Sequence, residues 1–263
     1  MAVMAKTPRP GQVKTRLVPP LTAAEATALN AAFLRDITAR IAAIGQRLPV
    51  AGFVAYAPAG GAALFDGLLA PGTGLVLADG SVALGPDVAG IGRSLIHATR
   101  GLLALGFDAV CLVNSDSPTL PATILAEAAA ELALGRRVVL GPAEDGGYYL
   151  IGIPAALAAP AEALFRDIPW STAGVTAATL ARAAEAGIPV RCLPAWYDVD
   201  DPPSLRRLVK ALAAADQARV RDGERAGERA GERTPGPAGD PAPETAACIA
   251  RLGLRQRLAD LTP

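Results

Sequence analysis

The sequence predicts an α/β protein whose sheet is mostly parallel and is covered by helices on both faces. Apolar, strand-like runs alternate with amphipathic segments from the first residue to about residue 213, and this alternation is typical of parallel sheets. The run Val110–Val113 has the length and β-branching of a fully buried strand. A chain of 263 residues can bury one large core with length left over. We therefore expect a three-layer domain over residues 1–215.

Individual elements follow from local signals. The clearest is a helix over Thr22–Ile44, where Thr22 and Glu25 form a capping box, an apolar stripe follows, and Gly45 ends the helix. Residues 57–90 are rich in Gly, Ala and Pro and yield no assignment beyond a short apolar piece. The other expected helices are Arg93–Leu105, Ala122–Leu134, Val175–Ala186 and Pro203–Ala214. The expected strands are Ala2–Ala5, Pro49–Tyr56, Val110–Asn114, Val138–Gly141, Tyr148–Ile153 and Val190–Leu193.

The C-terminal part has a different composition. Residues 223–233 read GERAGERAGER, and each glycine inside a helix costs about 1 kcal/mol relative to alanine. The TPGPAGDPAP stretch that follows cannot be helical. We therefore expect a flexible linker over 216–243 and a short helix over 244–263, which docks on the domain or on a partner protein.

Composition excludes several classes of partner. Lys plus Arg equals Asp plus Glu at 25 each, which argues against nucleic acid or an anionic membrane as a partner. No apolar run approaches a membrane span and no signal peptide is recognisable, so a cytoplasmic protein is expected. Cys111, Cys192 and Cys248 are widely spaced, as expected of buried free thiols in a reducing compartment. The single histidine, His97, is expected to be packed or solvated rather than catalytic.

The most informative motif is the segment Asn114–Pro118 (NSDSP), which directly follows the buried strand. Parallel strands place ligands just beyond their carboxyl ends, so Asp116 is expected on a rigid support facing a crevice. A carboxylate there is suited to a divalent metal and the phosphates bound to it. The alternative is that Asp116 caps the next helix or closes a turn.

A basic loop follows the first strand. It carries four cations in eleven residues, Lys6, Arg9, Lys14 and Arg16, and Gly11 permits close approach of the backbone. Such a loop is suited to a polyphosphate. It matches neither a P-loop nor a dinucleotide fingerprint, and a solvated basic loop is the alternative.

Two acidic clusters complete the candidate site. Glu144 and Asp145 stand in a glycine-rich loop between two expected strands. Asp198 and Asp200 follow the last strand, and they would point the same way if the segment is extended. For either cluster alone, a turn with capping carboxylates is the alternative.

Taken together, the motifs resemble a known family. They are Lys6–Leu17 (KTPRPGQVKTRL), Ser115–Pro121 (SDSPTLP), Gly141–Gly152 (GPAEDGGYYLIG), Ile168–Thr172 (IPWST) and Asp198–Asp200 (DVD). Over about residues 1–212 the chain resembles the bacterial GT-A-like glycosyltransferase family associated with radical-SAM, selenodomain and arsenosugar gene clusters. It is more distantly similar to the nucleotidyltransferases of molybdopterin-cofactor and phospholactate chemistry. Where the family has Gly-Asp-Leu-Gly-x-Arg-Met, this chain reads AGIGRSL over residues 89–95. Either its base or sugar selectivity is therefore expected to differ from that of typical members, or its site is expected to be weakened.

The resemblance implies a GT-A (nucleotide-diphospho-sugar transferase-like) fold and a role for each motif. It implies Mg²⁺ or Mn²⁺ held by Asp116 with Asp198 or Asp200, and Asp145 together with Asp116 as catalytic residues. Nucleotide and phosphate binding falls to Lys6, Gly11, Lys14, Arg16, Gly92 and Arg93. The acceptor side is formed by Tyr148, Trp170, Ser171 and Thr172.

Three functions remain open from the sequence. The first is a glycosyltransferase with a nucleotide-sugar donor and a small-molecule acceptor. The second is a nucleotidyltransferase that joins a nucleoside triphosphate to a phosphorylated small molecule and releases pyrophosphate. The third is a non-catalytic nucleotide-binding protein whose C-terminal tail contacts a protein partner.

Overall fold

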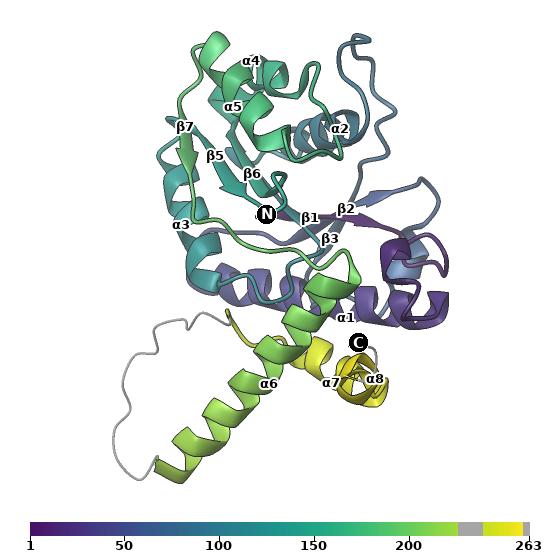
Figure 1. Ribbon diagram of the computed structural model, residues 1–263. Coiled ribbons are helices and arrows are strands. Elements are labelled where there is room, and N and C mark those ends of the chain that lie inside the picture. Colours follow the sequence, from purple (N-terminus) through teal and green to yellow (C-terminus); the bar gives the residue numbers. More distant parts are fainter. Residues whose placement is uncertain (226–238, 260–263) are drawn as a thin grey trace.

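The computed structural model of the protein describes residues 1–225 and 239–259. At the centre of the described part of the chain is a seven-stranded sheet with the strand order β3-β2-β1-β4-β6-β5-β7 (Figure 1). Strand β6 runs antiparallel to its neighbours β4 and β5, and all other neighbours pair in parallel. The strands are β1 (Ala2–Lys6), β2 (Phe53–Ala57), β3 (Gly74–Leu77), β4 (Ala109–Asn114), β5 (Val138–Pro142), β6 (Tyr148–Pro154) and β7 (Val190–Cys192).

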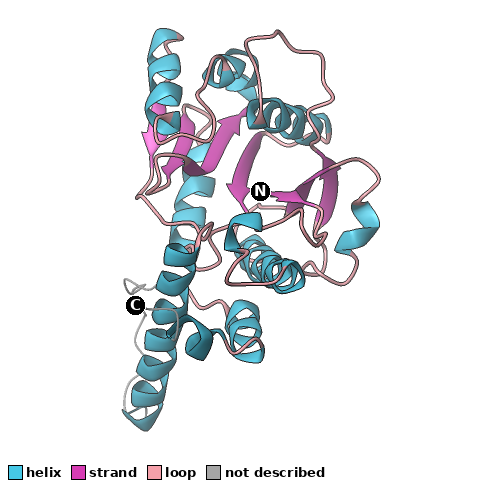
Figure 2. Ribbon diagram, turned by 45° about the vertical axis from the view of Figure 1, so that its right-hand side comes forward, coloured by secondary structure: helices cyan, strands magenta, loops and turns pink. Residues whose placement is uncertain are grey.

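Helices cover both faces of this sheet, which confirms the expected three-layer architecture (Figures 1 and 2). One face carries α1 (Ala23–Gly45) and α3 (Ala122–Ala133), and the opposite face carries α2 (Ile91–Ala104), α4 (Ala158–Ala161) and α5 (Val175–Glu185). The short 3₁₀ helices are η1 (Thr15–Leu17), η2 (Ala62–Phe65), η3 (Ala155–Leu157) and η4 (Glu162–Phe165). The unassigned stretch 57–90 contains η2 and β3.

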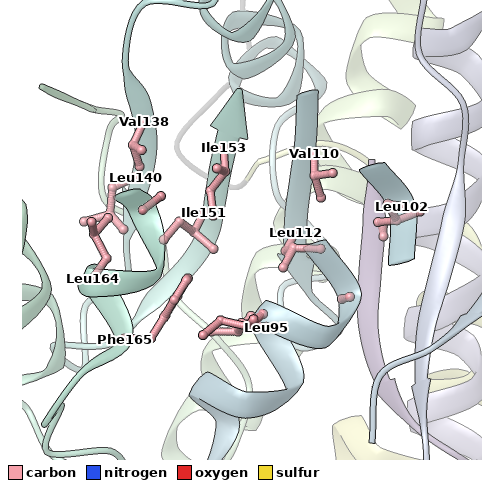
Figure 3. Close-up of a cluster of buried hydrophobic side chains, with 14 of the residues drawn as sticks. Leu95, Leu102, Val110, Leu112, Val138, Leu140, Ile151, Ile153, Leu164 and Phe165 are labelled. Atoms are coloured by element: carbon pink, nitrogen blue, oxygen red, sulfur yellow. The ribbon is translucent and has the colours of Figure 1, made fainter. Parts of the chain in front are cut away.

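Strand β4 shows why its sequence is apolar at every position. Val110 and Leu112 point to one core cluster, where Leu95 of α2 and Phe165 of η4 also lie (Figure 3). Cys111 and Val113 point to the other face, in the cluster beneath α1 and α3. Alternate side chains of a strand face opposite sides, so a strand with helices on both faces must be apolar throughout.

The three cysteines are free, but only two are buried. Cys111 lies in the core, where burial raises the pKa of its thiol to about 12, so it is held as an unreactive thiol. Cys248 is also buried. Cys192 is exposed, contrary to expectation, because it ends β7, the strand at one edge of the sheet.

The C-terminal part corrects the expected linker. Helix α6 runs from Pro202 to Arg225, so residues 216–225, which we expected to be flexible, are helical. The rest of the expected linker up to residue 238, with most of the glycine repeat, lies outside the described residues. In place of one helix there are two, α7 (Pro243–Arg251) and α8 (Leu254–Ala259).

These last helices pack on the domain itself. Ile249 and Leu254 are buried in one cluster with Leu29 and Phe33 of α1 and Leu208 of α6. Helix α1 therefore buries apolar residues on two sides, one against the sheet and one against α6, α7 and α8 (Figure 1). The sequence left open whether the C-terminal segment packs on its own domain or on a partner protein, and in the structure α7 and α8 pack on their own domain. No helix in the described part of the chain is long and apolar enough to cross a membrane.

The capping box at the start of α1 also anchors α8. The Glu25 carboxylate accepts from the Thr22 backbone N–H at 2.8 Å, and the Glu25 N–H donates to the Thr22 hydroxyl at 3.2 Å, as the sequence predicts. The same carboxylate accepts from the Arg257 guanidinium at 2.7 Å. Hydrogen bonds from Arg257 and from Thr22 lower the pKa of Glu25 from 4.5 to about 2.

We expect Glu25→Gln to lower the melting temperature at neutral pH. Because the folded-state pKa of Glu25 lies below its unfolded value, its contribution is present above pH 4.5 and is lost as the pH falls toward 2. The side chain is partly exposed, so the loss is about 1 kcal/mol. Thermal unfolding of the parent and the variant at several pH values measures the difference between their melting temperatures. Glu185→Gln, which removes an exposed pair with Arg182 inside α5, is the control. A difference in melting temperature that does not change with pH contradicts the prediction.

Candidate functional site

The four polar segments identified in the sequence meet at one edge of the sheet. Strands β1, β4, β5 and β7 all run in the same direction, because β4 and β5 each pair antiparallel with β6. Their carboxyl ends therefore lie at one edge. The segments that follow them are 7–16, 115–121, 143–147 and 193–201.

Lys14 is the centre of the site. Its ammonium Nζ lies 2.6 Å from Asp116 Oδ1, 2.8 Å from Asp200 Oδ1 and 2.7 Å from the carbonyl oxygen of Val199. The Lys14 side chain is only 4% exposed, against 29% and 39% for the two carboxylates. Burial by itself lowers the pKa of Lys14, but the two carboxylates outweigh it and raise the pKa above its usual value. Lys14 is thus a buried cation that joins two acidic segments.

The backbone at Lys14 has an unusual conformation. Its φ of 49° and ψ of 38° are left-handed, which costs a non-glycine residue about 1–2 kcal/mol. The contacts of the ammonium offset this cost, and they direct the side chain from the first loop into the acidic cluster.

Two further carboxylates belong to the same region. Burial, and after it the negative charges of Asp200, Asp145 and Asp116, together raise the pKa of Asp198 from 3.8 to about 6. Asp145 is exposed, and its Oδ1 accepts from the Gly147 backbone N–H at 2.8 Å. The site thus gathers four carboxylates from three segments, and two of them, Asp116 and Asp200, contact the buried ammonium of Lys14.

The remaining cations of the first loop face solvent beside this cluster. Lys6, Arg9 and Arg16 are exposed. The side chains of Lys6 and Arg9 form no hydrogen bond or ion pair with any residue that the structure describes. Hydrogen bonds from Ser204 lower the pKa of Asp201, and the positive charge of Arg16 adds to this effect, so Arg16 lies close to that carboxyl. These side chains are available to an anionic ligand.

The acidic residues fit a hard divalent cation in their chemistry. No preassembled group of three or more His, Cys, Asp or Glu ligands occurs among the described residues. Mg²⁺ is usually bound by one or two carboxylates, with phosphate and water oxygens completing its shell. Asp116 with Asp198 or Asp200 meets this requirement, and Lys14 supplies the neutralising charge in the conformation described here.

The segment that carries Asp116 is tied to the segment that carries Asp198 and Asp200. The Val199 N–H donates to the Asp116 carbonyl oxygen at 2.9 Å, and the Ser117 hydroxyl donates to the Tyr197 carbonyl oxygen at 3.0 Å. The carboxylates therefore approach each other because backbone atoms hold the two segments in register.

A residue that the sequence did not single out braces the other acidic loop. Arg207 of α6 forms an ion pair with Glu144, beside Asp145, and its guanidinium stacks 4.0 Å above the Tyr197 ring. The Tyr197 hydroxyl in turn is 2.9 Å from the Thr119 hydroxyl. No spacing within α6 distinguishes Arg207 from its neighbour Arg206, so the sequence carries no signal for this role.

The residues expected on the acceptor side fall into two pairs. The rings of Tyr148 and Trp170 pack edge to face with centroids 6.2 Å apart, and the buried ring nitrogen of Trp170 has no hydrogen-bond partner among the described residues. Ser171 and Thr172 are exposed, and the Thr172 hydroxyl donates to the Pro169 carbonyl oxygen at 2.7 Å.

Gly92 and Arg93 are placed by the start of α2. Gly92 is buried under Trp170, where a side-chain carbon would come within 3.0 Å of the indole ring. The Arg93 guanidinium donates to the Val82 carbonyl oxygen at 2.6 Å and to that of Val88 at 3.5 Å. These bonds shape the loop before α2, and none of them joins Arg93 to the carboxylate cluster.

Comparison with known proteins places the chain in a family. Residues 40–172, half of the chain, match the family of uncharacterised proteins conserved in bacteria, DUF2064. The chain belongs to this family. No curated protein matches the DUF2064 chain.

Solved structures are similar to this DUF2064 protein to different degrees. A proposed nucleotide-diphospho-sugar transferase from Desulfovibrio desulfuricans G20 is 26% identical with a TM-score of 0.71, over 97% of this chain and 95% of that one. A CMP:2-keto-3-deoxy-manno-octonic acid synthetase complexed with CTP is 13% identical with a TM-score of 0.49, over 82% and 98%. A cytidylyltransferase from Leptospira borgpetersenii serovar Hardjo-bovis is 8% identical with a TM-score of 0.49, over 100% and 96%. The first of these confirms the nucleotide-diphospho-sugar transferase-like fold.

Proposed function

We propose that the protein is a metal-dependent glycosyltransferase that moves a sugar from a nucleotide-diphosphate donor to a small-molecule acceptor. The observation that carries this proposal is the meeting of Lys14, Asp116 and Asp200 at the carboxyl edge of the sheet, beside exposed cations. A diphosphate needs positive charge, and a divalent ion bound to it needs carboxylates. Both are within one site. We also propose that the gene of this protein lies in a radical-SAM, selenodomain or arsenosugar gene cluster, as the resemblance implies.

The donor side is assigned to the first loop. Lys6 and Arg16 would hold the phosphates by charge-assisted hydrogen bonds, and the exposed backbone at Gly11, with φ of 76°, leaves room for close approach. Lys14 neutralises Asp116 and Asp200 in the free protein. Mg²⁺ or Mn²⁺ bound by Asp116 with Asp198 or Asp200 would supply Lewis-acid stabilisation of the leaving diphosphate.

The acceptor side is assigned to the segments around Asp145. The exposed Asp145 carboxylate would accept the hydrogen bond of an acceptor hydroxyl and take up its proton, which contributes about 10²–10⁴-fold when a residue acts as general base. Tyr148 and Trp170 would form the apolar wall of this side, with Ser171 and Thr172 at its exposed rim. Cytoplasmic location, as expected from the sequence, stays a prediction.

Product analysis tests the function directly. The full chain is incubated with Mn²⁺ or Mg²⁺ and a panel of nucleotide-sugars with hydroxylated small molecules, and in parallel with nucleoside triphosphates and sugar phosphates. We expect release of nucleoside diphosphate that depends on the metal. The fold shared over almost the whole chain with the proposed nucleotide-diphospho-sugar transferase supports this expectation.

Two other results would replace the proposal. Pyrophosphate release from a triphosphate would make the protein a nucleotidyltransferase, because the same loop and carboxylates serve both reactions. Nucleotide binding without any product would make it a non-catalytic nucleotide-binding protein. Asp116→Asn, tested in the same assays, shows whether any product arises at this site.

A further inference from the structure

A short C-terminal segment, Gly239–Thr245, lies against the loop that carries Asp116. We call this segment the C-terminal clasp. The Asp240 backbone N–H donates to the Thr119 carbonyl oxygen at 3.0 Å. A side-chain carbon at Gly239, whose φ is +77°, would lie 2.2 Å from that same oxygen, so only glycine allows this close approach. The clasp thus contacts the loop that carries Asp116, although the two are more than 100 residues apart in the sequence.

The side chain of Asp240 caps a helix to which it does not belong. Helix α3 begins after Pro121, which has no side-chain group that could cap it. The Asp240 carboxylate accepts from the backbone N–H of Ala122, the first residue of α3, at 2.7 Å. Carboxylates are favoured at helix N-termini because unpaired N–H groups and the helix dipole both attract negative charge. Asp240 therefore fixes the end of the segment that begins at Asp116.

Buried Arg40 joins the clasp to the same loop. Its guanidinium donates to the Pro118 carbonyl oxygen at 2.8 Å and to the Pro241 carbonyl oxygen at 2.7 Å. Its Nε also lies 3.7 Å from Asp240 Oδ2, and the Arg40 side chain is 7% exposed. One side chain of α1 thus bonds to both partners, with little access for competing water.

At its other end the clasp is anchored because a side chain of α1 caps the N-terminus of α7. Asp36 of α1 accepts from the backbone N–H groups of Glu244 and Thr245 at 3.0 and 2.8 Å, and from the Thr245 hydroxyl at 2.6 Å. These groups start α7, whose own N-cap residue, Ala242, forms no side-chain cap. The clasp is therefore held at both ends and cannot shift without breaking a buried hydrogen bond.

We propose that the C-terminal clasp positions the Asp116 loop, with Asp240 as its positioning residue. The loop is bound both by residues 197–199 and by the clasp. Release of the clasp would loosen residues 116–122, and Asp116 would then bind a cation less tightly. This inference rests on the proposed function, because it assigns Asp116 to the metal.

Local hydrogen exchange tests the positioning role without any ligand. We compare the full-length parent with Asp240→Ala, Asp240→Asn and the control Asp216→Ala. Asp216 also ties the C-terminal helices to the domain, through Arg255 at 2.7 Å, but touches no part of the site loop. We expect amides of residues 116–124 to exchange about five- to tenfold faster in Asp240→Ala, the usual effect of a lost cap. Asparagine, which still accepts from the Ala122 N–H, should restore most of the protection.

Binding of Mn²⁺ with UDP and with GDP, followed by electron paramagnetic resonance, is the second measurement. We expect Asp240→Ala to weaken it about threefold or more and Asp216→Ala to leave it unchanged. If the parent binds neither complex, the proposed function fails, and the exchange result still decides the clasp. Unchanged exchange over 116–124 in Asp240→Ala, or an increase spread evenly over the chain, overturns the clasp. Should the alanine variant not fold, Asp240→Glu, which moves the carboxylate off the Ala122 N–H, must show the same local increase.

Discussion

Asp116→Asn is expected to abolish metal-dependent nucleotide binding. The substitution keeps the size of the side chain and removes its charge, and a neutral amide is a poor ligand for Mg²⁺ or Mn²⁺ beside a phosphate. We expect the affinity for Mn²⁺ with a nucleoside diphosphate to fall at least about 100-fold, since even outer-shell changes at metal sites cost 10–100-fold. Calorimetric titration of Mn²⁺ in the presence of UDP or GDP measures this loss.

The fold should survive this substitution. Lys14 keeps Asp200 and the Val199 carbonyl oxygen as partners at 2.8 and 2.7 Å, so no buried charge is left alone. Asp66→Asn, at an exposed position after η2, is a matched control for the same chemical change. If Asp116→Asn binds metal and nucleotide as tightly as the parent, Asp116 is not a metal ligand.

Lys14→Met is expected to make the protein's stability dependent on a divalent cation. Methionine has a similar length without the charge, so Asp116 and Asp200 lose the ammonium that neutralises both. Removal of one partner from a buried ion pair costs about 3–5 kcal/mol, and the partial exposure of the two carboxylates places this site near the lower value. Without added metal, the melting temperature should therefore fall clearly.

Added Mn²⁺ should restore part of this loss. In the variant the cation binds to unneutralised carboxylates, whereas in the parent it competes with Lys14 for the same oxygens. Ligand binding to the folded state raises the melting temperature, so the shift caused by Mn²⁺ should be larger in Lys14→Met than in the parent. Thermal unfolding with and without Mn²⁺ measures both shifts, and Lys210→Met on an exposed position of α6 is the control. Equal shifts in all three proteins would show that Lys14 does not occupy the cation site.

The direction of β6 shows where sequence patterns reach their limit. The alternation of strands and helices predicts a mainly parallel sheet, and most neighbours do pair in parallel. Strands β5 and β6 are separated by only residues 143–147, which is too short for a parallel crossover. Strand β6 is therefore antiparallel, and it brings Tyr148 and the Asp145 loop to the same edge as Asp116.

The C-terminal boundary was predicted from composition and was placed wrongly. Glycines and prolines after residue 222 indicated a linker, but residues 215–222 contain neither, and α6 continues through them to Arg225. The docking of α7 and α8 depends on a second apolar side of α1, including Leu29 and Phe33. Apolar residues on two sides of a helix indicate that it packs against other segments on both sides. They do not indicate which segments of the chain these are.

By itself the sequence determined the local structure and the polar segments of the candidate site. The Thr22–Glu25 capping box, the buried run of β4 and the ends of most elements depend on residues a few positions apart. Only the tertiary structure decided that Lys14 bonds to Asp200, 186 residues away, and that Asp240 caps α3. Periodicity and capping act within a few residues of the chain, whereas these contacts depend on the strand order and on which surface each helix covers.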